Sequence, residues 1–534
     1  MMTMTKNQQL ERQNKDLKTL LSNLKAKQEL AEVSYQEQLA SLKNDLGSMP
    51  DQIKQLREHN AKKDEIIAKQ KEKIITLKNE NTKLSKSLEK AKQLIGKLRA
   101  RLRKDSSTSD KPSSTDAFKK PKPQSLREKS GKKPGGQPGH AGHTLPIYPN
   151  PTRIIEIKPE NCSHCGCAVE ITGDYAAKQK VDIEVIVNVT EERAFKGICP
   201  DCGKATVGEF SDGFKSQVSY GDNVKAATAL ISEHGFVSVS KTAEIISSLT
   251  GGAVNLSWGT VVNMQKELSR KLEDTIDIIR AGLIAGKVIG ADETGCRVNG
   301  SLDWIQIFCN EDFALFGLNE NRGAIDGNLG ILAYFVGILV HDHLSSYYKY
   351  ATLTHAECNE HVLRVLKGLA EIFKHSWIQE MSELLKRACH EKNELVRRNE
   401  TAMPQEKIEE FTKEYEAILQ KGWREYSAAT NGNKSSESYY VEEKRLLARL
   451  GEFKEEHLLF LNDFDAPFTN NLSEQGIRKV KGKLKVAGCF RSLEGAIAYA
   501  RIASLITTLI KQDKNVFEGI RLVYSGQSPM QSSA

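Results

Sequence analysis

Residues 287–295 read Lys-Val-Ile-Gly-Ala-Asp-Glu-Thr-Gly, an apolar run of strand length that ends in two carboxylates and a short polar segment. A short apolar run bounded by polar residues and glycine is typical of a buried strand. Two further short strands follow at hairpin spacing, over residues 304–309 and 313–317. The segment therefore predicts a sheet in which acidic side chains stand at strand ends.

Two later segments bring further carboxylates. Residues 337–342 read Gly-Ile-Leu-Val-His-Asp, a strand that ends in Asp342, and residues 470–474 read Asn-Asn-Leu-Ser-Glu and lead into a helix. Side chains at strand ends hold nearly fixed positions, so we expect Asp292 beside Asp342, with Glu474 completing the group. Such oxygen ligands suit two Mg²⁺ ions, which serve phosphoryl displacement. Surface acids at strand ends remain the alternative interpretation.

The segment after Glu474 is strongly basic. Between Gln475 and Leu493 it contains no acid and six basic residues, namely Arg478, Lys479, Lys481, Lys483, Lys485 and Arg491. A carboxylate followed at once by dense positive charge fits a metal site beside a DNA phosphate track. A solvated basic helix face would give the same pattern.

The region over residues 220–280 predicts three helices. Residues 223–234 form an amphipathic pattern, Ser240 is a plausible N-cap of a second helix, and a third helix starts near Ser257 after a glycine-containing turn. This order resembles a helix-turn-helix and suggests DNA binding. Any small helical bundle would look alike, so the pattern leaves DNA contact open.

A zinc ribbon is expected over residues 151–210. Two Cys-x-x-Cys motifs lie there, each followed by glycine, and residues 181–189 between them have strand-like alternation. Four thiolates close a tetrahedral structural site without a position for water. A redox role is the alternative for one motif alone, and His164 and Cys167 are interpreted as bystanders. The four expected ligands of Zn²⁺ are Cys162, Cys165, Cys199 and Cys202.

The N-terminal residues 1–104 predict a coiled coil. A heptad repeat places Ile67, Ile74, Asn81, Leu88, Ile95 and Leu102 on one seam position and Leu77, Leu84, Ala91 and Leu98 on the other. A single asparagine among apolar seam residues favours a parallel dimer, so we expect at least a homodimer. A long amphipathic helix packed on the body is the alternative. The basic segment 105–150 is expected to be a flexible tether, with or without phosphate contacts.

Composition bounds these expectations. The 534 residues are 39% hydrophobic and 27% charged, with a net charge of +8, so disorder throughout is excluded. The longest apolar run, residues 331–340, is too short for a membrane span. A secretory leader is not expected after Met1, and five of the ten cysteines cluster between Cys162 and Cys202. Clustered cysteine without a disulfide framework indicates metal binding in a cytoplasmic protein that has no membrane partner.

Several motifs occur together in one order. They are Ala291-Asp-Glu-Thr294, Val340-His-Asp-His-Leu-Ser-Ser-Tyr-Tyr348, His355-Ala-Glu-Cys-Asn-Glu-His361, Asn470-Asn-Leu-Ser-Glu-Gln-Gly-Ile-Arg478 and Gly488-Cys-Phe-Arg-Ser-Leu-Glu-Gly-Ala496. With the cysteine motifs, the coil and the basic segment, the chain closely resembles the bacterial insertion-sequence transposases of the family numbered sixty-six. The resemblance covers nearly the whole chain.

This resemblance implies a multi-domain α+β protein and an Mg²⁺-dependent DDE transposase. It implies a ribonuclease-H-like α/β catalytic domain over residues 285–534, with an all-α insertion at about 355–460. Asp292, Asp342 and Glu474 then carry over as catalytic carboxylates for two Mg²⁺ ions per site. The implied partners are insertion-sequence ends, target DNA and small accessory proteins of the same element, all at the bacterial nucleoid.

Other features of the resemblance leave questions open. Cys358 and His361 match the family's Cys-x-x-His step, with a structural or metal-binding role possible for both. The family often has Ala-Glu-Arg around the third acid, where this chain has Ser473-Glu474-Gln475. A catalytically inactive DNA-binding regulator, or a metal-dependent nuclease that does not join strands, remains an alternative to a transposase.

Overall fold

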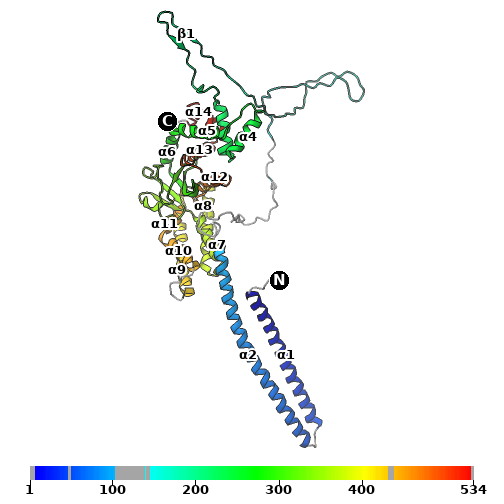
Figure 1. The fold of residues 1–534 in the computed structure, drawn as a ribbon. Helices are drawn as coiled ribbons and strands as arrows, with labels where there is room; N and C mark the ends of the chain where they lie inside the picture. The colour runs from blue at the N-terminus through cyan, green and yellow to red at the C-terminus, as the bar shows by residue number, and fades with distance from the viewer. Residues whose placement is uncertain (1–5, 46–49, 103–138, 140–144, 431–437, 531–534) are drawn as a thin grey trace. The chain divides into compact units, whose positions relative to one another are not determined.

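Figure 1 shows the fold in a computed structural model that describes residues 6–45, 50–102, 139, 145–430 and 438–530. The chain divides into two compact units. One comprises Met1–Lys119 and Ala356–Thr469, and the other comprises Lys120–His355 and Asn470–Ala534. Each unit is described separately.

The second unit is built on a five-stranded mixed sheet in the order β5-β4-β3-β6-β7. Strands β3 and β4 pair antiparallel, as do β4 and β5, whereas β3 and β6 run parallel. Asn299 and Gly300 form the two-residue β3–β4 turn with positive φ at both positions, as such hairpins require. The strands are β3 (Val288–Val298), β4 (Ser301–Cys309), β5 (Ala314–Asn319), β6 (Ile338–His341) and β7 (Thr354–Glu357). The strands expected from the sequence around residues 287–342 are therefore present.

Helices cover both faces of this sheet. Because successive strand side chains alternate, Ile289 and Ala291 of β3 pack with α6 (Glu273–Ile284) and α13 (Leu493–Lys511). Cys296 and Val298, with the opposite parity, pack with α12 (Asn471–Ala487). The short α14 (Val516–Tyr524) adds Ile520 and Val523 to the first of these cores.

Helix α13 is long and apolar enough to cross a membrane, and it is the one such helix in the described part of the chain. In its most apolar 18-residue window, 61% of the residues are buried. The hydroxyl groups of Ser504 and Thr508 accept hydrogen bonds from the backbone N–H groups of Phe316 and Ala314 in β5. Its apolar character is thus explained by packing against the sheet.

A small helical bundle precedes the sheet in the same unit. It comprises α3 (Asp222–Ala229), the π-helix η2 (Leu230–His234), α4 (Val239–Leu249) and α5 (Trp258–Lys271). The expected N-cap Ser240 is wrong, because α4 begins earlier and Ser238 accepts the hydrogen bond from the Lys241 N–H. The expected start of the third helix is confirmed, since Ser257 caps α5.

The first unit contains the expected helical stretch between the second and third acids. Its helices after β7 are α7 (Asn359–Ala370), α8 (Ser376–Arg397), α9 (Gln405–Thr430), α10 (Ser438–Glu452) and α11 (Lys454–Asn462). Trp377 and Tyr415 are fully buried among them, and the Trp377 indole donates a hydrogen bond to the buried Glu443 carboxylate. These helices run from Asn359 to Asn462, and the compact unit contains this part of the chain as Ala356–Thr469.

The N-terminal helices α1 (Lys6–Asp45) and α2 (Pro50–Leu102) lie side by side in one chain, as Figure 1 shows. They run antiparallel, since Lys63 Nζ contacts both Gln38 Oε1 at 3.4 Å and the Tyr35 ring. Ile74 on the α2 seam is buried. Within one chain α1 thus lies against α2, and the parallel pairing of two copies stays a prediction. The basic segment 105–150 lies largely outside the described residues.

The cysteine-bearing region has little regular structure. Strands β1 (Lys196–Ile198) and β2 (Ala205–Val207) form a two-stranded antiparallel sheet. The strand expected over residues 181–189 is wrong, because the structure assigns no strand to those residues. Their alternating apolar side chains lack a partner strand, and Ile183 and Val189 are almost fully exposed.

Candidate active site

The first two carboxylates lie on neighbouring parallel strands. In the β3–β6 register, Val288 pairs with Ile338 and Gly290 pairs with Val340. Two residues further along each strand are Asp292 and Asp342, so the register brings them opposite one another. Asp342 comes directly after the end of β6.

Helix α12 brings the third carboxylate to the same sheet. Glu474 lies in the first turn of α12, and its side chain is largely buried. The preceding Asn470 donates a hydrogen bond from Nδ2 to the backbone oxygen of Ala291 at 2.6 Å. Ser473 donates to Asn470 Oδ1 at 2.8 Å. These contacts fix the start of α12 beside Asp292, on the strand that carries the first acid.

Two glycines permit this close approach. A Cβ on Gly290 would lie 2.6 Å from Asn470 Oδ1 and would overlap Ser473 Oγ. A Cβ on Gly476 would overlap the side chain of Ile307 in β4. The absence of both side chains lets the helix that carries Glu474 rest directly on the sheet.

The three carboxylates influence each other electrostatically. Burial raises the pKa of the Asp292 carboxyl well above its ordinary value, and the negative charges of Glu293, Asp342 and Glu474 raise it further. The Asp292 carboxylate accepts a hydrogen bond from the backbone N–H of Glu293 at 2.8 Å. Carboxylates that repel one another in a buried site are suited to bind a divalent cation, because the cation would neutralise their charge.

A fourth acid and an arginine lie next to this group. The buried Glu293 accepts hydrogen bonds from Arg322 Nε at 2.8 Å and from the Tyr347 hydroxyl at 3.0 Å. Burial raises the pKa of Glu293 to about 7, the charge of Asp342 adds to this rise, and Arg322 opposes it. Arg322 Nη2 also lies 3.6 Å from Asp342 Oδ2. The motifs did not include Arg322, and they included Tyr347 without assigning it a role, because the contacts of both residues with Glu293 depend on the tertiary fold.

With this geometry in hand, comparison with known families identifies the chain. The model of the Transposase IS66 family matches residues 232–498, half of the chain. The chain belongs to this family. A family of unknown function, DUF6444, matches residues 48–146, which include α2. Comparison with curated proteins finds no match.

The residues matched to the transposase family include all three carboxylates and the basic segment of α12. The basic side chains there face different surroundings. Arg478 Nη2 pairs with Glu474 Oε2 at 3.0 Å, and Lys485 and Arg491 are exposed. Burial lowers the pKa of Lys479, and the charge of Lys511 lowers it further.

Lys483 points into the protein rather than to solvent. Its ammonium donates to the buried Glu233 carboxylate at 3.0 Å and to the backbone oxygen of Ser232 at 2.9 Å. It therefore ties α12 to the π-helix of the helical bundle. Lys481 is partly buried. The six basic residues expected to contact DNA thus do not form one uniform solvent-facing row.

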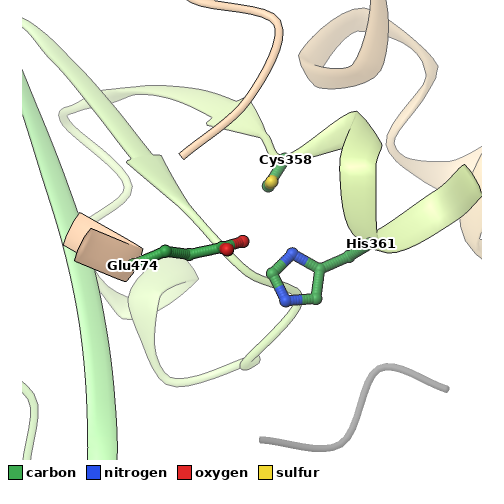
Figure 2. Close-up of side chains that lie close together, drawn as sticks. All are labelled: Cys358, His361 and Glu474. Carbon is green, nitrogen blue, oxygen red and sulfur yellow. The ribbon is translucent and has the colours of Figure 1, made fainter. Parts of the chain in front are cut away.

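The Cys-x-x-His step begins helix α7 in the other unit. Cys358 is the N-cap residue and His361 lies in the first turn, so both are on one side of the helix start (Figure 2). Both residues are buried, and their ligand atoms lie within 4.8 Å of one another. Glu474, which Figure 2 also draws, belongs to the unit that contains the sheet. A thiol and an imidazole at this spacing can serve as two ligands of a metal ion.

Both cysteine motifs adopt the same local turn. Gly166 N–H donates to Cys162 O at 2.9 Å, and Gly203 N–H donates to Cys199 O at 2.9 Å. Backbone N–H groups at the thiols lower the pKa of Cys162 and of Cys199. Lowered thiol pKa values fit metal binding. Among the described residues, however, the four sulfur atoms do not come together in one group of ligands.

Proposed function

We propose that this IS66-family protein is a DDE transposase that binds the ends of its insertion sequence and catalyses metal-dependent strand cleavage and strand transfer. The main support for this proposal is that Asp292, Asp342 and Glu474 come together from two parallel strands and one helix of the same unit. We further propose that the β5-β4-β3-β6-β7 sheet is a ribonuclease-H-like core, with the helical stretch inserted between its second and third acids.

In this proposal the three carboxylates would hold two Mg²⁺ ions. When bound, such a pair activates the attacking oxygen and stabilises the leaving oxygen of an in-line phosphoryl displacement. The protein contributes fixed ligand positions. Asp342 Oδ1 accepts a hydrogen bond from the Leu344 N–H at 3.1 Å, and Asn470 anchors the helix start that carries Glu474.

DNA is the proposed partner, as insertion-sequence ends and as target. The exposed Lys485 and Arg491, at and just beyond the C-terminal end of α12, support phosphate contacts on the same unit as the acids. In the helical bundle, Trp258 is 67% exposed at the start of the capped helix α5, where a helix-turn-helix would contact bases. The protein would then act at the bacterial nucleoid in the cytoplasm.

The remaining parts would assemble and stabilise the complex. We propose that Cys162, Cys165, Cys199 and Cys202 bind one structural Zn²⁺, supported by the lowered thiol pKa at each motif. Self-association of at least two copies would bring two DNA ends together, with α1 and α2 as the candidate contact. Small accessory proteins of the same element would be further partners.

The decisive experiment supplies purified protein with labelled end DNA and Mg²⁺. A transposase should nick the end and join a precut end to target DNA. Products that are cut but never joined would favour a metal-dependent nuclease, and binding without any cut would favour an inactive regulator.

A further inference from the structure

Arg322 connects a buried carboxylate to one of the proposed metal ligands. Its Nε and Nη2 atoms lie 2.8 and 2.7 Å from Glu293 Oε1, and Nη2 lies 3.6 Å from Asp342 Oδ2. One planar guanidinium therefore faces two acids that come from two different strands. Arginine suits this position, because its donors form a rigid fork.

Glu293 belongs to this contact and not to the group of three carboxylates. Neighbouring residues of a strand point to opposite faces, so Glu293 faces away from the side on which Asp292 meets α12. Glu293 is 2% exposed, and its second oxygen accepts the hydrogen bond from Tyr347. Both of its oxygens are thus engaged by the protein, which leaves it poorly placed to bind metal.

Arg322 is itself held in place. Its guanidinium carbon lies 5.3 Å from the centre of the Trp304 ring on β4, and its side chain is one-third exposed. With Glu293 on one side and Trp304 on another, the fork has few other orientations. Asp342 consequently has a partner at each oxygen, the Leu344 N–H at Oδ1 and Arg322 at Oδ2.

We propose that Arg322 is a positioning residue that orients the Asp342 carboxylate for metal binding, with Glu293 as the buried anion that holds Arg322 in place. This inference rests on the proposed function, in which Asp342 is a metal ligand. Mutation of a group that orients a metal ligand typically lowers metal affinity or activity by about 10- to 100-fold. Arg322 makes no contact with the metal in this arrangement and acts through Asp342.

The experiment must distinguish two roles of Arg322, namely neutralising the charge of Glu293 and orienting the Asp342 carboxylate. Arg322→Met alone would leave Glu293 buried and unpaired, which is destabilising whatever the role of Arg322. The double variant Glu293→Gln/Arg322→Met removes both charges together, and such replacements are often neutral for stability. It therefore tests the effect on Asp342 without an orphaned charge.

The experiment measures three properties of the full-length protein: thermal unfolding, Mn²⁺ binding by calorimetry without DNA, and Mg²⁺-dependent cleavage of end DNA. The double variant should unfold near the wild-type temperature, yet bind Mn²⁺ and cleave about 10- to 100-fold less well. The matched control is Arg280→Met. Arg280 has a similar exposed fraction, 30% against 33%, and donates to Leu329 O and Asp277 outside the site. This control should retain wild-type Mn²⁺ binding and cleavage.

Mn²⁺ affinity and cleavage within about twofold of wild type in the double variant would overturn the inference. If that variant fails to fold, Arg322→Lys decides the question by the same measurements. The lysine keeps the charge beside Glu293 but loses the fork, so weaker Mn²⁺ binding supports positioning and unchanged binding overturns it. Asp342→Asn identifies failure of the proposed function instead, because wild-type Mn²⁺ binding in that variant would remove Asp342 as a ligand.

Discussion

The sheet that carries Asp292 and the cysteine-bearing region before it differ in how they are stabilised. In the sheet, Ile289 and Leu339 are fully buried between covering helices. In the cysteine-bearing region, Ile157 is 91% exposed and Ile183 is 88% exposed. Both regions contain apolar residues in strand-like patterns, yet one region buries them and the other does not.

The difference shows which region can form through packing alone. Burial of apolar surface stabilises the sheet and holds its acidic side chains in place. The cysteine-bearing region has two well-formed motif turns at Cys162 and Cys199 but little core to join them. A small module without a core commonly gains its folding free energy from a bound metal.

Substitution of the acids should have the largest effect. Asp292→Asn, Asp342→Asn and Glu474→Gln keep the side-chain shape but remove the charge that would hold Mg²⁺. Loss of a metal that contributes several kcal/mol to transition-state stabilisation lowers the rate by roughly a thousandfold or more. Cleavage of labelled end DNA in Mg²⁺ measures this, while binding of the uncut end should be nearly unchanged.

Asp326→Asn provides a control for the acid variants. Asp326 is also buried, but its carboxylate accepts hydrogen bonds from the Ile331 and Leu332 N–H groups and so acts in the fold. Its substitution should lower the unfolding temperature more than the cleavage rate of the folded fraction. Near wild-type cleavage by any of the three acid variants would exclude that residue as a ligand.

Disruption of the zinc site should have the next largest effect, confined to the cysteine-bearing region. Apparent binding free energies of structural zinc are about 10–16 kcal/mol, so Cys199→Ser should unfold this region locally. Metal analysis should find about one zinc per chain in the wild type and a clear loss in the variant. Limited proteolysis within residues 145–218 should become faster, and specific binding to end DNA should weaken.

Cys489→Ser is the matched control, because Cys489 is exposed and lies outside both motifs. It should leave the zinc content and the proteolysis rate unchanged. Unchanged zinc in Cys199→Ser would point to a different metal site, with Cys358 and His361 the next pair to substitute. That result would also contradict the idea that bound zinc, and not packing, stabilises the cysteine-bearing region.

The sequence predicted the strands at residues 287–342 because apolar runs of strand length bounded by polar residues have few alternatives. It also predicted the opposition of Asp292 and Asp342, since neighbouring strand ends fix their side chains. The partnership of Arg322 and Tyr347 with Glu293 could not be predicted, because Arg322 reaches Glu293 from the segment after β5 and Tyr347 from the short 3-10 helix η3 (Tyr347–Lys349), whose placement depends on tertiary packing. Strand alternation alone could not show that Glu293 faces an arginine.

The same reasoning was wrong where a pattern required a partner that the sequence does not specify. Residues 181–189 alternate like a strand, but a strand needs a neighbour with which to form hydrogen bonds, and the structure assigns none. The heptads of α2 predicted a seam, but a heptad pattern does not specify whether α1 or a second copy of the chain packs against it; in the structure α1 contacts α2, and the pairing of two copies stays a prediction. Lys483 was predicted to contact DNA because it lies in a basic run, and its ion pair with Glu233 could not be foreseen because the two residues are 250 positions apart in the sequence.

Two glycine-to-alanine substitutions, one in each region, should have smaller effects and allow the packing of the two regions to be compared directly. In the sheet, a Cβ on Gly290 would meet Asn470 Oδ1 at 2.6 Å and displace the start of α12. Overpacking of this kind costs about 1–3 kcal/mol, so Gly290→Ala should lower the unfolding temperature and weaken cleavage. In the cysteine-bearing region, a Cβ on Gly197 would meet no atom within 4 Å, so Gly197→Ala should change neither. Equal unfolding temperatures for the two variants would contradict the tight packing of α12 on β3.

The smallest expected effect concerns the N-terminal helices, which the structure closes within one chain. Lys63 contacts Gln38 and the Tyr35 ring at the surface, and such contacts contribute at most about 1 kcal/mol, so Lys63→Ala should barely alter stability. The position of the contact is more informative than its strength. In a Gln38→Glu variant, a carbodiimide should link residues 38 and 63 through a zero-length amide bond.

Mixing isotopically heavy and light protein then distinguishes the two ways of covering the α2 seam. An antiparallel pair within one chain gives linked peptides that are entirely heavy or entirely light. Pairing between copies gives mixed peptides as well. The residue 38–63 link forms only where α1 and α2 are neighbours, so abundant mixed peptides would favour a seam shared between chains. Light scattering of the same sample should then show whether self-association through another surface is still needed to explain a dimer.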